Sequence, residues 1–119
     1  MPKKILVIDD EIELAESLVV WLKSLGYETA TAADGISGIG KFKEELPDLV
    51  LLDIMMPGLS GLDVLKEIKE LNKDIPVIML TAYGTPQSAI EALRLGAYDH
   101  LGKPFNTETL LEMIKRAFS

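Results

Sequence analysis

Cysteine is absent from this chain of 119 residues, and histidine and tryptophan each occur once. The lack of cysteine excludes disulfides, thiolate catalysis and zinc sites with cysteine ligands, and it fits a reducing compartment. We therefore expect a cytoplasmic protein. With a single histidine as well, a transition-metal site lacks its usual ligands, so any metal chemistry has to use oxygen atoms.

Clusters of basic residues and long apolar runs are also missing. The formal net charge is −7, and nucleic-acid binding needs clustered lysine and arginine, so we expect no direct contact with nucleic acid. No run approaches the roughly 20 apolar residues of a membrane span, and the run before Asp9 is too short for a signal peptide. The sequence predicts one domain over residues 1–119 with no membrane partner.

Strand-like and helix-like segments alternate, five of each, which is typical of βαβ units. Residues 5–8, 49–52 and 77–80 are continuous apolar runs, as in central strands buried on both faces, whereas 29–32 and 98–101 are more polar and suit sheet edges. This pattern predicts an α/β fold, a doubly wound five-stranded parallel sheet in the flavodoxin-like order 2-1-3-4-5 with five helices on both faces.

The second helix-like segment, residues 35–46, has two glycines in its interior, Gly38 and Gly40. Each costs roughly 1 kcal/mol against alanine inside a helix, so they either let the helix lie close to the sheet or leave it mobile. The apolar residues expected on inner helix faces are Ile36, Ile39 and Phe42 in the second helix and Ile90 and Leu93 in the fourth. Helix starts are predicted at Ser60 and at Thr85, and a helix end at Gly26.

Polar side chains end the apolar runs or follow them. Asp9 and Asp10, Asp53, Thr81 and Lys103 would meet at the carboxyl edge of the sheet, where such folds bind ligands. Taken singly, each residue is more often a cap, a turn residue or a solvated side chain. Together, three neighbouring carboxylates repel one another unless they hold a cation. Mg²⁺ is the expected metal, with Mn²⁺ as a substitute.

A carboxylate at such a metal can act as a nucleophile toward phosphorus. Asp53 would then form an acyl phosphate, the Lys103 ammonium would neutralise charge on the phosphoryl oxygens, and Thr81 would donate a hydrogen bond. Backbone N–H groups after Asp53 could supply further donors. The sequence thus predicts a phosphoryl-transfer site.

The chain resembles the response-regulator receiver domains of two-component signalling from Lys3 to about Phe118. The motifs that carry the resemblance, in this order, are Val7-Ile8-Asp9-Asp10-Glu11, Asp53-Ile54-Met55-Met56-Pro57-Gly58, Leu80-Thr81-Ala82 and Lys103-Pro104-Phe105. Their order and spacing together are specific, although each motif alone is weak.

The resemblance implies a role for each site residue. Asp53 is similar to the phosphoacceptor, and Mg²⁺ would be held by Asp10, Asp53 and the backbone carbonyl of Met55, with Asp9 acting through water. Lys103 would pair with the aspartyl phosphate. The resemblance implies no turnover enzyme, but a protein that catalyses its own phosphorylation and dephosphorylation.

The resemblance also implies a switch. Thr81 would move toward the phosphoryl group, and Tyr83 and Pro104 belong to the same region; the peptide bond before Pro104 is cis in many relatives. His100 stands where relatives usually carry the tyrosine or phenylalanine that is coupled to Thr81. The readout face would be the fourth helix, fifth strand and fifth helix.

The implied partners are a histidine kinase or histidine phosphotransfer protein, and an output domain or effector. Residues 81–105 also resemble receivers that control enhancer-binding transcription activators. The sequence leaves two questions open. One is whether phosphorylation produces a homodimer through the fourth-helix face, and the other is whether the chain is a stand-alone receiver or part of a longer regulator.

Three rival functions were weighed. A phosphatase of the haloacid-dehalogenase kind expects a second aspartate two residues after the first, where this chain has Met55. A flavin-binding module expects a phosphate-cradling loop after the first strand, where Asp9-Asp10-Glu11 would repel phosphate. A receiver fold that serves only as an interaction scaffold is disfavoured by the complete acidic set.

Overall fold

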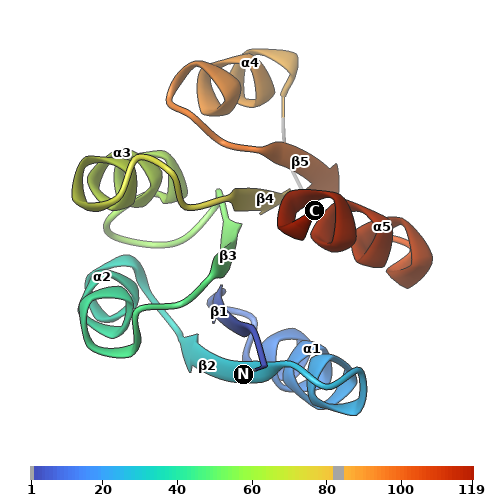
Figure 1. Cartoon of the computed structure of the whole chain (residues 1–119). Coiled ribbons are helices and arrows are strands. Elements are labelled where there is room, and N and C mark those ends of the chain that lie inside the picture. Colours follow the sequence, from blue (N-terminus) through green and yellow to red (C-terminus); the bar gives the residue numbers. More distant parts are fainter. Residues whose placement is uncertain (1, 82–84) are drawn as a thin grey trace.

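The computed structural model describes residues 2–81 and 85–119, which form a parallel sheet between two layers of helices (Figure 1). Within these residues the strands are β1 (Lys4–Ile8), β2 (Glu28–Ala32), β3 (Leu49–Asp53), β4 (Val77–Thr81) and β5 (Asp99–Gly102). The helices are α1 (Ile12–Ser24), α2 (Gly35–Glu45), α3 (Gly61–Leu71), α4 (Pro86–Arg94) and α5 (Thr107–Phe118). The sheet order is β2-β1-β3-β4-β5, so the predicted flavodoxin-like fold is confirmed.

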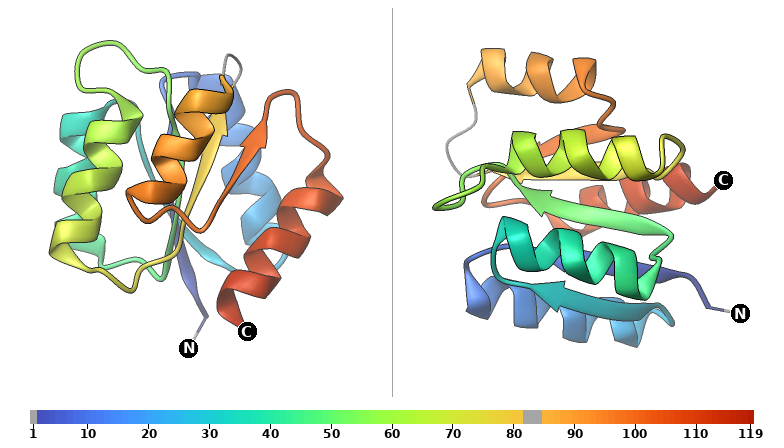
Figure 2. Two further views of the ribbon diagram at one scale, coloured as in Figure 1. Left: turned by 90° about the horizontal axis from the view of Figure 1, so that it is seen from above. Right: turned by 90° about the vertical axis from the view of Figure 1, so that its left-hand side faces the viewer.

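The central strands are apolar except for one terminal residue each, because helices cover both faces of the sheet. Helices α1 and α5 lie on one face, and α2, α3 and α4 on the other (Figures 1 and 2). Alternate residues of β1 accordingly enter opposite cores: Ile5 and Val7 pack toward α1 and α5, whereas Leu6 and Ile8 pack toward α2 and α3. The predicted edge strands, β2 and β5, are the more exposed ones.

Side-chain caps begin α3 and α4 at the carboxyl edge of the sheet. The Ser60 hydroxyl accepts a hydrogen bond from the Asp63 N–H at the start of α3. Thr85 and Ser88 form a reciprocal capping box at the start of α4. Both starts were predicted, as was Gly26, which follows α1 with φ +94°. No helix in the described ranges is long and apolar enough to cross a membrane.

The expected inner faces of two helices were partly wrong. Ile36 of α2 is 76% exposed, and Ile90 and Leu93 of α4 are 52% and 47% exposed. The buried residue of α4 is Ala92. In α2 the predicted Ile39 and Phe42 are buried, and Gly35 and Gly38 are buried with them. Hydrophobicity alone thus selected Ile36, Ile90 and Leu93, whereas smaller neighbours, Gly35 and Ala92, are the buried residues.

The two glycines in the interior of α2, Gly38 and Gly40, have different surroundings. A Cβ atom at Gly38 would lie 2.8 Å from Cδ1 and 2.9 Å from Cγ2 of Ile8, a fully buried residue of β1. A Cβ atom at Gly40 would meet no described atom within 4 Å. Gly38 is therefore the residue that lets α2 lie close to β1, and Gly40 has no such role.

This difference predicts opposite effects for two alanine substitutions in one helix. Gly38→Ala should lower the free energy of unfolding by about 1–3 kcal/mol, because Ile8 has no room to move. Gly40→Ala should raise it by about 0.5–1 kcal/mol through helix propensity. Urea denaturation of both variants beside the wild type measures the effects, and equal changes would contradict the assignment.

Candidate functional site

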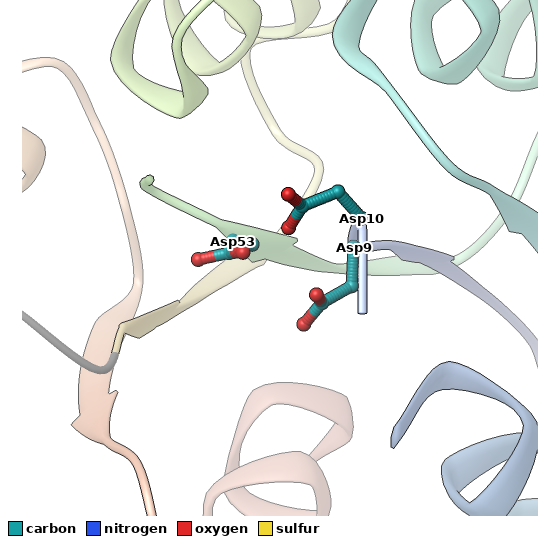
Figure 3. Close-up of side chains that lie close together, drawn as sticks. All are labelled: Asp9, Asp10 and Asp53. Carbon is teal, nitrogen blue, oxygen red and sulfur yellow. The ribbon is translucent and has the colours of Figure 1, made fainter. Parts of the chain in front are cut away.

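Three carboxylates meet at the carboxyl edge of the sheet. Ile8 pairs with Leu52 in the register of β1 and β3, so Asp9, which follows β1, lies beside Asp53 at the end of β3. Asp10 is the next residue along, and Figure 3 shows its side chain with those of Asp9 and Asp53 around one space. One oxygen from each lies within 4.8 Å of the others. The structure thus brings together the three acids that the sequence predicted.

The start of α3 is packed directly behind the end of β3. A Cβ atom at Gly61 would overlap the carbonyl oxygen of Asp53 and lie 2.6 Å from the Cα atom of Ile54. The Gly61 N–H donates a hydrogen bond of 2.9 Å to the Ile54 carbonyl. Only glycine permits this approach, so Gly61 fixes the backbone that carries Asp53. The Ser60 cap predicted where α3 begins, but nothing in the sequence indicated the close contact of Gly61 with the backbone of Asp53.

The backbone brings Lys103 to the acids from the far end of the chain. Gly102 pairs with Thr81 in the register of β4 and β5, and the Lys103 N–H donates a 2.7 Å hydrogen bond to the Thr81 carbonyl. The peptide bond between Lys103 and Pro104 is cis. Lys103 therefore begins the loop that follows β5 at the same edge as the acids.

Among the residues that the structure describes, 2–81 and 85–119, the cation that pairs with these acids is the ammonium of Lys103. Its Nζ atom lies 2.7 Å from Asp9 Oδ2, 2.9 Å from Glu11 Oε1 and 3.6 Å from Asp53 Oδ2. The side chains of Lys103, Asp9 and Asp53 are almost completely buried. The contact with Glu11 was not predicted, because Glu11 stands out in the sequence only as part of a motif.

The burial of these charges shifts their proton affinities. Desolvation and the neighbouring charge of Asp9 raise the pKa of Asp53 to about 7, although Lys103 and the Met55 N–H act in the opposite direction. Desolvation alone would lower the pKa of Lys103, but its hydrogen bonds to Asp9 and Glu11, together with the charges of Asp9 and Asp53, outweigh burial and raise it. One buried ammonium thus leaves the acids under-compensated, as expected of a site for a further cation.

Other predicted site residues that the structure describes also lie near this edge. The Met55 N–H donates a 3.2 Å hydrogen bond to Asp53 Oδ1, and Thr81 is buried at the end of β4. His100 is half-buried in β5, with Nδ1 3.8 Å from Asp99 Oδ1. Tyr83 lies outside the described residues. A cavity of about 350 Å³ is lined by Ile54, Thr81, Thr85, Pro86, Ser88, Ala89, His100, Gly102 and Lys103.

The strand order and the acids at the switch point between β1 and β3 define a CheY-like α/β domain with a candidate magnesium site. The family model for the response regulator receiver domain matches residues 5–115. This chain belongs to that family, whose members are signalling domains of two-component systems and not conventional enzymes.

Similar proteins support the same assignment. The chain is 47% identical over 113 residues to a probable transcriptional regulator, ycf27, of Cyanophora paradoxa, with 95% of this chain and 47% of the relative covered. A CheY-like receiver domain protein from Methanospirillum hungatei superposes with a TM-score of 0.94 at 33% identity, covering 98% and 93% of the two chains. NtrX from Brucella abortus gives 0.91 at 39% identity, with 98% of this chain and 27% of NtrX covered. The chain therefore spans about half the length of the curated relative.

The raised pKa of Asp53 predicts a pH-dependent effect of its charge on stability. Its pKa is about 7 in the folded protein against a reference of 3.8. Ionisation of Asp53 therefore leaves the free energy of unfolding unchanged below pH 4, lowers it increasingly between pH 4 and 7, and lowers it by the full amount above pH 7. In metal-free buffer at pH 8, Asp53→Asn should raise the free energy of unfolding by on the order of 2 kcal/mol, and by less at pH 5.

Thermal unfolding with a chelator at the two pH values measures this effect. Glu70→Gln, which removes an exposed charge from α3, is the matched control and should change neither value. An Asp53→Asn variant less stable than the wild type at pH 8 would contradict the charge argument.

Proposed function

We propose that residues 1–119 act as one receiver domain that accepts a phosphoryl group on Asp53 from a histidine kinase or histidine phosphotransfer protein. The observation that carries this proposal is the placement of the Asp53 carboxylate. It is buried beside Asp9 and Asp10, and Oδ2 lies 3.6 Å from the Lys103 ammonium. Nucleophile, metal ligands and counter-charge thus converge on one carboxyl group.

In the proposed step, one oxygen of Asp53 attacks the phosphorus atom of the donor. The bond between phosphorus and the donor's nitrogen or oxygen breaks, its electron pair leaves with the donor, and Asp53 becomes an acyl phosphate. Lys103 neutralises charge on the transferred group, and the Met55 N–H, which is already directed at Asp53, is available as a hydrogen-bond donor. The domain thereby catalyses its own modification without turning over a substrate.

The acids suit a hard divalent cation, because every side-chain ligand is an oxygen and the set is under-compensated by Lys103 alone. We assign Asp10, Asp53 and the backbone carbonyl of Met55 as ligands of Mg²⁺, with Asp9 acting through water and Mn²⁺ as a substitute. When bound, the cation would neutralise the carboxylates and the phosphoryl oxygens.

The acyl phosphate would act on a switch made by Thr81, Tyr83, His100 and Pro104. Thr81 and His100 line the same cavity beside Lys103, which supports a coupled movement of the two. We propose that the output face is formed by α4, β5 and α5. On it, α4 presents exposed Ile90 and Leu93, which are available to an effector, an output domain or a second copy.

The output we propose is the control of transcription through a partner or an attached domain. The longer curated relative is named as a probable transcriptional regulator, which supports this choice. The domain itself has no expected contact with nucleic acid or membrane, and its cytoplasmic location stays a prediction.

The first prediction of this function is a covalent phosphoryl group on Asp53. Incubation with acetyl phosphate and Mg²⁺ should add one phosphoryl mass to the protein, as measured by intact-mass spectrometry. The addition should be absent in Asp53→Asn and with a chelator. Modification that survives in Asp53→Asn would refute the assigned acceptor, and steady phosphate release from excess donor would favour the phosphatase instead.

The second prediction concerns metal binding without any donor. At a concentration ten times its dissociation constant, Mg²⁺ should stabilise the wild type by about 1.4 kcal/mol, and Asp10→Asn should reduce this gain strongly. Thermal unfolding across a magnesium titration measures it. Glu70→Gln should respond like the wild type, and a full response in Asp10→Asn would contradict the ligand assignment.

A further inference from the structure

Glu11 lies beside the acid cluster without being one of its three members. It occupies the N-cap position of α1, but its side chain makes no capping hydrogen bond. Instead, Oε1 accepts a hydrogen bond of 2.9 Å from Lys103 Nζ. The side chain of Glu11 is 57% exposed, whereas that of Asp9, the other partner of Lys103, is fully buried.

The hydrogen bonds of Lys103 direct its ammonium away from the phosphoacceptor. An ammonium has three N–H donors, and two of them are used by Asp9 and Glu11. Asp53 Oδ2 lies 3.6 Å away, which is an ion-pair distance but too long for a hydrogen bond. The structure thus holds the Lys103 ammonium closer to Asp9 and Glu11 than to Asp53.

We propose that Glu11 is a positioning residue that holds Lys103 in a resting place, and that phosphorylation of Asp53 breaks the Glu11–Lys103 pair. This inference rests on the proposed function. A phosphoryl group on Asp53 adds negative charge and acceptor oxygens beside the ammonium and competes for its donors.

Burial decides which of the two partners Lys103 releases. Asp9 would be left as a buried, unpaired carboxylate, which is costly. Glu11 is largely exposed, so water solvates it as soon as Lys103 turns away, and the loss is small. The Asp9 contact therefore persists in both states, and the Glu11 contact is the one that breaks.

The test measures the rate of phosphorylation by acetyl phosphate at saturating Mg²⁺. If breaking the pair is part of the barrier, Glu11→Gln should raise the maximal rate about 1.5-fold to fivefold, the range expected for a partly exposed ion pair. The KM for acetyl phosphate should stay unchanged. Glu11→Asp, which keeps the charge, should stay closer to the wild type than Glu11→Gln does.

Two comparisons separate positioning from a general loss of negative charge. Glu13→Gln removes an exposed charge from the same turn of α1 and should leave the rate unchanged. The effect of Glu11→Gln should also vanish when Lys103 is replaced by methionine, because Glu11 acts through Lys103. Acceleration that persists in the Lys103→Met background would overturn the inference.

The nitrogen resonance of the Lys103 ammonium, followed by NMR, gives a readout that does not depend on turnover. Glu11→Gln should shift it in the unphosphorylated protein toward its phosphorylated position, and Glu13→Gln should not. A wild type that takes no phosphoryl group would defeat the proposed function. A wild type modified on Asp53, with Glu11→Gln equally fast or slower and no shift in the resonance, would defeat this inference alone.

Discussion

The burial of β1 beside β3 is the constraint on which the site depends. Apart from Lys4 at the start of β1 and Asp53 at the end of β3, both strands are apolar and buried on both faces, and their register leaves Asp9 and Asp53 as neighbours where the strands end. The two carboxylates cannot move apart without opening both cores. The free energy gained by burying the two strands therefore outweighs the electrostatic repulsion between the two carboxylates.

Charge compensation at the site comes from a residue remote in sequence. Lys103 lies 94 residues after Asp9 and reaches it only because β5 joins the sheet beside β4. Since this ammonium pairs with several acids, it cannot cancel all of their charge. The remaining negative charge accounts for the affinity we expect for a divalent cation and adds to burial, which is the main cause of the raised pKa of Asp53.

The strand order and the cluster of acids could be predicted because both follow from simple patterns. Apolar runs of strand length mark buried parallel strands, and their polar ends must share an edge. The contacts of Gly61 and Glu11 could not be predicted, since they depend on distances between segments that no periodicity encodes. Ile90 and Leu93 were misplaced for a related reason: hydrophobicity marks bulky residues, whereas the packed stripe of α4 is set by small ones.

Because every strand points the same way, the ends of the chain and the acids occupy opposite poles of the domain. Both termini lie at the pole where the strands begin (Figure 2). A sequence joined directly to α5 would thus start far from Asp53. A modification of Asp53 would affect it through conformational changes in the domain. Such long-distance transmission favours outputs driven by relative movement of helices over outputs that touch the modified residue.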